Sequence, residues 1–274
     1  MSTAEKAMRM PVVFISHGSP TLAFDDVPAR DFLVRLAAKL PRPKAILCIS
    51  AHWEAAIPSV TGSDAPSTIH DFYGFPQALY DLRYDAPGDP TLAARVVRLL
   101  EDGGHNAMIN SDRGLDHGVW SPLILTYPQS GIPVVQLSLM HHRGPADHVA
   151  LGRLLAPLRD EGILILASGG AVHNLRALDW NNRSGVSDSG ISDWAGAFEQ
   201  WLTDRIAAGD IAALSDYRAQ APHANIAHPS EDHILPLFVA LGAAAGSADK
   251  AVGERIHRSF TFGSLSMSSY AWGL

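Results

Sequence analysis

The sequence has only one cysteine, Cys48, in a chain of 274 residues. A single cysteine excludes an internal disulfide and is typical of a protein from a reducing compartment. Cys48 lies in the apolar run AILCIS, where we expect it to pack as a small hydrophobic side chain. Cysteine is therefore also excluded as the main ligand type of any metal site.

Long apolar segments and clusters of basic residues are missing as well. The longest apolar stretch, ILPLFVALGAAAG from Ile234, is too short and too rich in Gly and Ala to span a bilayer, and the N-terminal MSTAEKAMRM lacks the apolar region of a signal peptide. The formal net charge is −7 and Lys and Arg form no run, so neither a nucleic acid nor an anionic membrane is expected as the main partner. We expect a cytoplasmic protein that binds small molecules.

Four familiar catalytic motifs are absent. The sequence has no His-Glu-x-x-His, no Gly-x-Ser-x-Gly, no P-loop and no Gly-x-Gly-x-x-Gly, so zincin proteases, α/β-hydrolases, nucleotide kinases and Rossmann enzymes each lack their signature. Ser19 and Ser168 remain conceivable nucleophiles, but neither lies in an elbow motif.

The chain alternates short β-branched runs with longer helical patterns. Runs typical of strands, apolar on both faces, begin at Val12, Ala45, Ala107, Pro133 and Ile163. A further run, FTFGSLSM over residues 260–267, alternates as a strand should. Helical patterns cover residues 28–40, 89–102, 145–161 and 192–208. This order predicts one α/β domain over residues 1–274, with a mostly parallel central sheet and helices on both faces.

Histidines follow three of the predicted strands. His17 follows the run from Val12, His52 the run from Ala45, and His173 the run from Ile163. Because ligands of open α/β sheets bind beyond the carboxyl ends of the strands, we expect these imidazoles to meet there. Imidazoles without cysteine favour zinc, iron or copper over calcium or magnesium. The sequence therefore predicts a metal site at the carboxyl ends of the strands.

Two more histidines lie shortly before a proline that belongs to an apolar run. These are His117 in LDHGVWSPL and His233 in SEDHILPLF. A proline is tolerated in the first helical turn, so both histidines are expected at helix N-termini that face the same crevice. Histidines in polar surroundings are expected to be solvated; these are His105, His148, His223 and His257.

The segment over residues 68–90, TIHDFYGFPQALYDLRYDAPGDP, is dense in aromatic residues, Gly and Pro. Loops of this kind often carry function, and four of its side chains could wall an aromatic substrate site: His70, Phe72, Tyr73 and Phe75. The same side chains could instead form a small satellite core under a long loop. Both interpretations stay open at this point.

Six motifs occur in order along the chain: HGSP at His17, SAHW at Ser50, IHDFYGFPQALYD at Ile69, LDHGVWSPL at Leu115, ASGGAVHNL at Ala167 and GSLSM at Gly263. Together they resemble the DODA-type extradiol ring-cleavage dioxygenases. That family includes bacterial and plant 4,5-DOPA dioxygenases and is related to the catalytic subunit of protocatechuate 4,5-dioxygenase. The resemblance runs almost end to end, over residues 11–267.

This resemblance implies a non-haem Fe(II) enzyme that opens the ring of a catechol such as DOPA with O₂, at a site often found with zinc in relatives. It implies that His17, His52 and His233 bind the metal. It further implies that His173 is the base or a further ligand, and that His117 is a second catalytic histidine of the pocket. A catechol bound through both oxygens would be made more acidic by the cation, and His173 would accept a proton from it.

The third ligand is open. The usual oxygen-activating iron site combines two histidines with one carboxylate, whereas the third ligand here is either His233 or one of its neighbours, Glu231 and Asp232. A site of histidines alone adds no negative charge and would hold zinc readily, while a carboxylate would favour iron.

Two other classes of function are compatible with the same histidines. One is a zinc-dependent hydrolase or lyase that uses a metal-bound hydroxide, and the other is a non-catalytic protein with a closed structural zinc site. The native catechol is also open, since DOPA, caffeate, protocatechuate-like acids and larger catechols would all fit. Arg113, Arg143 and Arg176 are the basic residues that could hold a carboxylate. The sequence indicates no oligomeric state.

Overall fold

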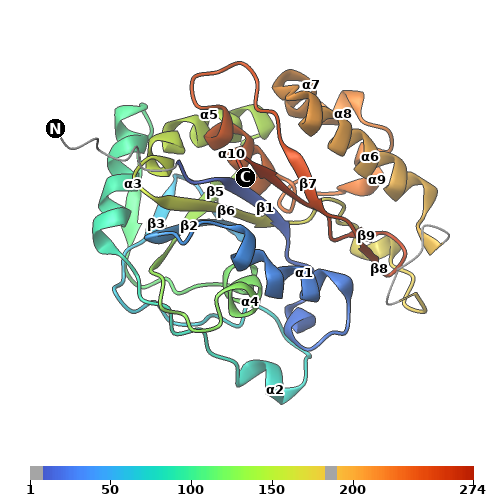
Figure 1. Ribbon diagram of the computed structural model, residues 1–274, viewed down its shortest axis with the longest axis horizontal. Helices are drawn as coiled ribbons and strands as arrows, with labels where there is room; N and C mark the ends of the chain where they lie inside the picture. Colours follow the sequence, from blue (N-terminus) through green and yellow to red (C-terminus); the bar gives the residue numbers. More distant parts are fainter. Residues whose placement is uncertain (1–8, 183–189) are drawn as a thin grey trace.

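Strands that are covered on both faces must be apolar along their whole length, and the central strands of this protein follow that rule. The computed structural model describes residues 9–182 and 190–274. Figure 1 shows a sheet between two layers of helices. The strands are β1 (Val12–Ser16), β2 (Ala45–Ala55), β3 (Ser59–Thr61), β4 (Met108–Asn110), β5 (Val134–Met140), β6 (Ile163–Gly169), β7 (Glu254–His257), β8 (Phe260–Thr261), β9 (Leu265–Ser266) and β10 (Ser269–Trp272).

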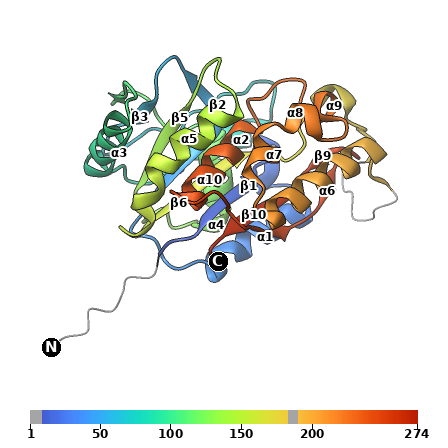
Figure 2. The same cartoon turned by 90° about the horizontal axis from the view of Figure 1, so that it is seen from above.

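The helices are α1 (Pro28–Leu36), α2 (Gln77–Tyr80), α3 (Pro90–Asp102), α4 (His117–Thr126), α5 (Pro145–Leu155), α6 (Asp193–Ala208), α7 (Ile211–Ser215), α8 (Tyr217–Gln220), α9 (Ala224–Ala227) and α10 (Leu235–Ala245). Short 3₁₀ turns are η1 (Pro20–Ala23), η2 (Ala37–Lys39), η3 (Ala156–Arg159) and η4 (Leu175–Ala177). Figures 1 and 2 both place α6 to α9 together on one side of the molecule, away from α3.

The main sheet has eight strands in the order β4-β3-β5-β2-β6-β1-β10-β7. Its centre is parallel, since β2 pairs with both β5 and β6, and β1 pairs with β6. Antiparallel pairs add β10 to β1, and β7 to β10. The prediction of one α/β domain with a mostly parallel sheet is therefore confirmed.

Two cores lie on the two faces of this sheet. Alternate residues of β1 point to opposite faces: Val12 and Phe14 pack with α5 and α10, while Val13 and Ile15 pack with α1 and α4. Figure 1 shows α5 and α10 above the sheet and α1 and α4 below it. Burial of each such side chain stabilises the fold by about 1.5–3 kcal/mol, so the pairing register that carries the site residues is firmly fixed.

The helix starts follow local chemistry closely. The Asp89 carboxylate accepts a hydrogen bond of 2.9 Å from the Leu92 backbone N–H, and Pro90 occupies the first turn, where its missing N–H costs nothing. The first and third predicted helices end earlier than expected, because their last turns tighten into η2 and η3. Among the described residues, no helix combines the length and the apolar character needed to cross a membrane.

Two strand predictions are wrong in detail. The run from Ala107 forms the edge strand β4, whose Met108 and Ile109 are 46% and 42% exposed rather than covered on both faces. The run over residues 260–267 is not one strand but the β8–β9 pair, because positive φ angles at Phe262 and Gly263 reverse the chain. The short strands β3, β7 and β10 lack the apolar runs that would have indicated them from the sequence.

Buried histidines outside the crevice correct another expectation. His148 is fully buried rather than solvated: its Nε2 accepts from the Met140 N–H at 3.1 Å, and its Nδ1 donates to the Gly144 carbonyl at 2.9 Å. His257 stacks on Phe32 with ring centroids 4.6 Å apart. His228 is also fully buried, and its Nε2 donates to the Ala171 carbonyl at 3.0 Å.

His228 is expected to make the fold sensitive to acid. Burial lowers the pKa of His228 to about 3, whereas an unfolded histidine titrates near 6.5. Its contribution to the free energy of unfolding is therefore complete above about pH 6.5 and is lost as the pH falls towards 3. At pH 5 this loss amounts to about 2 kcal/mol. Urea unfolding at pH 7 and pH 5 should show that His228→Gln loses about 2 kcal/mol less than the native protein over this interval. Parallel losses in both proteins, with His105→Gln as control, would contradict this role.

Candidate metal centre

The structure brings five histidines together at the carboxyl ends of neighbouring strands. His17 directly follows β1, His173 comes four residues after β6, His117 is the first residue of α4, and His233 precedes α10. The sequence predicted that His52 follows its strand, and this detail is wrong. His52 lies inside β2, where the pairing with β5 shifts register between Ile49 and Glu54. The irregularity places the imidazole of His52 beside those that come from the loops.

The rings lie within contact distance of one another. His17 Nε2 and His52 Nε2 are 3.0 Å apart. The ring centroid of His117 is 4.0 Å from that of His52 and 5.4 Å from that of His17, and the His233 ring is 5.0 and 5.4 Å from the same two rings. Within the described ranges, His17, His52 and His117 form a group whose possible ligand nitrogens all lie within 4.8 Å of one another. The cluster therefore contains the predicted metal-binding histidines His17 and His52, with both His233 and His117 close to them.

This donor set fits a divalent transition metal. Two nitrogens that bind one ion at 2.0–2.1 Å and at a right angle lie about 3 Å apart, which matches the separation of His17 Nε2 from His52 Nε2. Neutral imidazole nitrogens suit iron and zinc and do not suit calcium or magnesium.

A proline inside α4 fixes which nitrogen of His17 carries its proton. Pro122 has no N–H, so the carbonyl of Gly118, four residues earlier, lacks its helical donor. The Ser168 hydroxyl donates to that carbonyl instead. Because a hydroxyl has one hydrogen, Ser168 Oγ must accept from His17 Nδ1, which lies 2.9 Å away. His17 Nε2 is then left with its lone pair facing His52, and Ser168 is a support for His17 rather than a nucleophile.

The Asp71 carboxylate orients two of the histidines. Its Oδ1 accepts from His117 Nδ1 at 2.9 Å and from the His117 backbone N–H at 3.0 Å, and its Oδ2 lies 3.5 Å from His52 Nδ1. Burial raises the pKa of Asp71, but the hydrogen bonds from His117 outweigh burial and lower the pKa to about 2. The carboxylate is thus ionised at neutral pH, and it directs the Nε2 atoms of both rings away from itself.

Asp232 supports His233 in the same way. Asp232 Oδ2 accepts from His233 Nδ1 at 2.5 Å. The neighbouring Glu231 carboxylate instead accepts from the Tyr217 hydroxyl at 2.8 Å and from Arg218 Nε at 3.1 Å. Both carboxylates considered as alternative ligands therefore have other partners in this structure, and Asp232 serves the histidine beside it.

A buried network holds the backbone of His52. The Ser50 hydroxyl accepts from the His52 N–H at 3.1 Å and donates to Asp116 Oδ1 at 2.7 Å, and Asp116 is fully buried. Arg113 Nη2 donates to the His52 carbonyl at 3.2 Å and to Asp116 Oδ2 at 3.0 Å. Its guanidinium also lies over the Trp53 ring. Arg113 is therefore committed to supporting His52 and is not placed to hold a substrate carboxylate.

Burial keeps the clustered imidazoles neutral. Burial, followed by the charges of neighbouring histidines, lowers the pKa of His17 well below its usual value. Burial, followed by the charge of His117, lowers the pKa of His52 to about 4 against the opposing effect of two aspartates. Burial also lowers the pKa of His233 to about 3. At neutral pH these nitrogens hold lone pairs that a metal can use without displacing protons.

His173 lies flat against His233. The two ring centroids are 3.5 Å apart, and the ring planes are within 5° of parallel. The backbone N–H of His173 donates to the Ala227 carbonyl at 3.0 Å. Burial lowers the pKa of His173, so its ring is neutral and able to accept a proton. Gly169 permits this closeness, because a Cβ there would lie 2.1 Å from the His233 carbonyl oxygen.

The aromatic loop contributes only part of the predicted wall. Phe72 lies with its ring centroid 5.7 Å from His117 and 5.2 Å from Phe75. His70 instead donates to the Leu82 carbonyl at 3.1 Å and packs against Trp120, as a residue of a satellite core would. Tyr73 is 92% exposed, next to a turn at Gly74 with φ of +80°, and so does not wall the site. The segment thus combines both interpretations.

Sequence reasoning missed the supporting residues rather than the histidines. Asp71 and Asp116 lie within motifs already singled out, and Ser168 follows the apolar part of β6. Their proximity to His117 and His52 depends on loop paths that no local pattern encodes. The usable signal was Pro122. A proline inside a helix leaves the carbonyl four residues earlier without its helical donor, so another donor, here Ser168, can be expected beside it.

Replacing Asp71 with asparagine is expected to weaken metal binding about 10–100-fold, because residues that orient metal-bound histidines typically have effects of this size. Asparagine keeps the shape of the side chain but removes the charge that lies 3.5 Å from Nδ1 of His52, a histidine to which we assign the metal below. Metal affinity measured by competition with a chromogenic chelator checks this result. Asp64→Asn, at an exposed position before the same loop, should leave the affinity unchanged, and equal affinities for all three proteins would contradict the role of Asp71.

The chain is similar to proteins of known family over almost its whole length. Residues 11–272 match the family described as the catalytic LigB subunit of aromatic ring-opening dioxygenase. The chain is 45% identical over 262 residues to a 4,5-DOPA dioxygenase extradiol of Beta vulgaris, with 94% of each covered. It is 39% identical over 270 residues to a protein of the same name from Escherichia coli K12, covering 97% of this chain and 95% of the relative. An uncharacterized Escherichia coli K12 protein of known crystal structure matches with a TM-score of 0.78 and 35% identity, over 96% of this chain and 99% of that one.

Proposed function

Since this chain belongs to the LigB family of aromatic ring-opening dioxygenases and is an extradiol ring-cleavage enzyme, we propose that it cleaves a catechol such as DOPA with O₂ at a non-haem Fe(II) centre. The relatives in Beta vulgaris and Escherichia coli are named for 4,5-DOPA. The observation that carries the proposal is the convergence of the histidines, with Nε2 of His17 and His52 3.0 Å apart at the carboxyl ends of the strands.

We assign the metal to His17, His52 and His233. Each of them has its Nδ1 beside a protein oxygen, at Ser168, Asp71 and Asp232 respectively. When bound, the metal would supply a positive charge that holds and acidifies the diol and coordination positions for O₂. The Asp71 and Asp232 carboxylates would lie behind the histidines and not on the ion. There they supply negative charge around the centre without occupying a coordination position.

His173 is assigned as the base. It is neutral at neutral pH because burial lowers its pKa, and it stacks on a proposed metal ligand, so a diol held at the centre would come within reach of its ring. The role is to accept the proton of the second hydroxyl, for which positioned bases typically provide 10²–10⁴-fold in rate. His117, oriented by Asp71, is assigned to hold a proton and to donate it to the oxygen that comes from O₂. Phe72 is placed to contact the substrate ring.

The test is reconstitution of metal-free protein, under argon, with either Fe(II) or Zn(II). After O₂ is admitted, an oxygen electrode should record one O₂ consumed per 4-methylcatechol or DOPA in the Fe(II) protein, with visible absorbance from the ring-opened semialdehyde. The Zn(II) protein should consume none. Turnover that persists with Zn(II) in the absence of O₂ would instead indicate the hydrolase or lyase chemistry that the same histidines could support.

A further inference from the structure

A cavity of about 520 Å³ lies beside the metal centre. It is lined by residues from four separate segments, among them Ser19, Asp25, Asp26, Phe75, Trp180 and Phe262. Trp180 and Phe262 form an aromatic pair with centroids 5.1 Å apart, and Trp180 is 65% exposed, so this pair stands at the rim. The cavity is therefore open to solvent on the side of the aromatic pair.

Two contacts connect this cavity to the histidines. Ser19 is two residues after His17, and between them Gly18 lies under another lining residue, Met267: a Cβ on Gly18 would come within 2.7 Å of Met267 Cε. On the other side, Phe75 contacts Phe72, which contacts His117. These contacts place the cavity next to the segments that carry His17 and Phe72.

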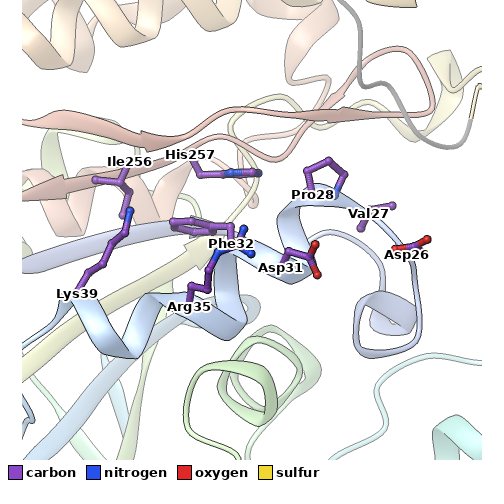
Figure 3. Close-up of a pocket in the computed structure, with 9 residues that line it drawn as sticks. All are labelled: Asp26, Val27, Pro28, Asp31, Phe32, Arg35, Lys39, Ile256 and His257. Atoms are coloured by element: carbon purple, nitrogen blue, oxygen red, sulfur yellow. The ribbon is translucent and has the colours of Figure 1, made fainter.

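The charged residues that line the cavity, within the described part of the chain, are both acidic. Asp25 is half-buried, and its Oδ2 accepts from the Thr21 hydroxyl at 2.7 Å, which fixes the carboxylate; Asp26 is more exposed. Among the lining residues that the structure describes, none is Arg, Lys or His. Arg35 and Lys39 line a different cavity of about 600 Å³, which shares Asp26 with the first. Figure 3 shows both cations displaced along α1 from Asp26.

We infer that this cavity is a subsite for the side chain of the catechol, and that it selects side chains ending in an ammonium group over those ending in a carboxylate. The inference rests on the proposed function and narrows its substrate class. The two carboxylates attract the cation, and the faces of Trp180 and Phe262 offer it a favourable quadrupole. A carboxylate-ended catechol meets repulsion there and finds no basic partner among the described lining residues.

The test compares three catechols with the Fe(II) protein: dopamine, 3-(3,4-dihydroxyphenyl)propanoate and the uncharged 4-methylcatechol. The kcat/KM for dopamine is expected to exceed that for the propanoate at least about tenfold. Asp25→Asn and Asp26→Asn should each lower this ratio about threefold to fivefold, the effect of one partly exposed ion pair. Asp31→Asn removes the same charge from the neighbouring cavity alone and should leave the ratio unchanged.

Since the ratio is measured within each protein, a variant of reduced stability still reports on selectivity. A native protein that cleaves 4-methylcatechol but favours the propanoate, or aspartate variants with an unaltered ratio, would overturn the subsite and leave the proposed function intact. Failure to cleave any of the three, 4-methylcatechol included, would overturn both.

Discussion

Alanine in place of His17, His52 or His233 is expected to remove the metal and to lower O₂ uptake with a catechol at least about 10³-fold. A divalent cation contributes several kcal/mol of charge stabilisation, and each 1.36 kcal/mol corresponds to a factor of ten in rate. Metal content measured by mass spectrometry after dialysis, together with an oxygen electrode, checks both effects.

The same experiment separates His233 from His117. Both rings lie close to His17 and His52, and each is oriented by an aspartate. His117→Ala is expected to keep its metal while activity falls, and His105→Ala, outside the centre, should behave as the native protein. Metal retained in His233→Ala and lost in His117→Ala would exchange the two assignments.

His173→Ala is expected to retain metal and to lose about 10²–10⁴-fold in kcat, the range that a positioned base provides. The ring of His173 stacks on His233 through its face, and a ring in that orientation supports a neighbouring ligand without itself pointing a nitrogen at the same ion. Metal content and catechol binding measured anaerobically should stay close to native values, which places the loss in the chemical step.

Loss of metal from His173→Ala would make His173 a fourth ligand instead. His173→Gln offers a matched comparison, since it restores bulk beside His233 but cannot accept a proton at neutral pH. If His173→Gln recovered most of the activity, the imidazole would be serving as packing and not as a base.

The histidines could be predicted from the sequence because each follows or precedes an apolar run whose place in an α/β sheet is known in advance. β1 and β6 are buried on both faces, so the positions of His17 and His173 beyond them depend only on strand direction. The partners of the histidines could not be predicted in this way. Asp71 reaches His117 from another loop, and Ser168 of β6 reaches Gly118 of α4, so both contacts exist only after the layers have packed.

The choice between a carboxylate and a histidine as third ligand shows the same limit. Glu231, Asp232 and His233 are adjacent in sequence, and each has a side chain of a type that can bind a metal. Packing separates them: Tyr217 and Arg218 bind Glu231, and Asp232 turns to the far nitrogen of His233. With His233 as the proposed third ligand, the negative charge would lie around the ion rather than on it, at Asp71, Asp116 and Asp232.

The position of β1 in the sheet has a consequence for biosynthesis. Of the described strands it is the first along the chain, yet its neighbours are β6 and β10, which come much later. Until β6 and β10 have been synthesised, the nascent strand that leads to His17 has unpaired edges, and such edges are prone to aggregation. Chaperones that shield this nascent strand should therefore raise the yield of active enzyme.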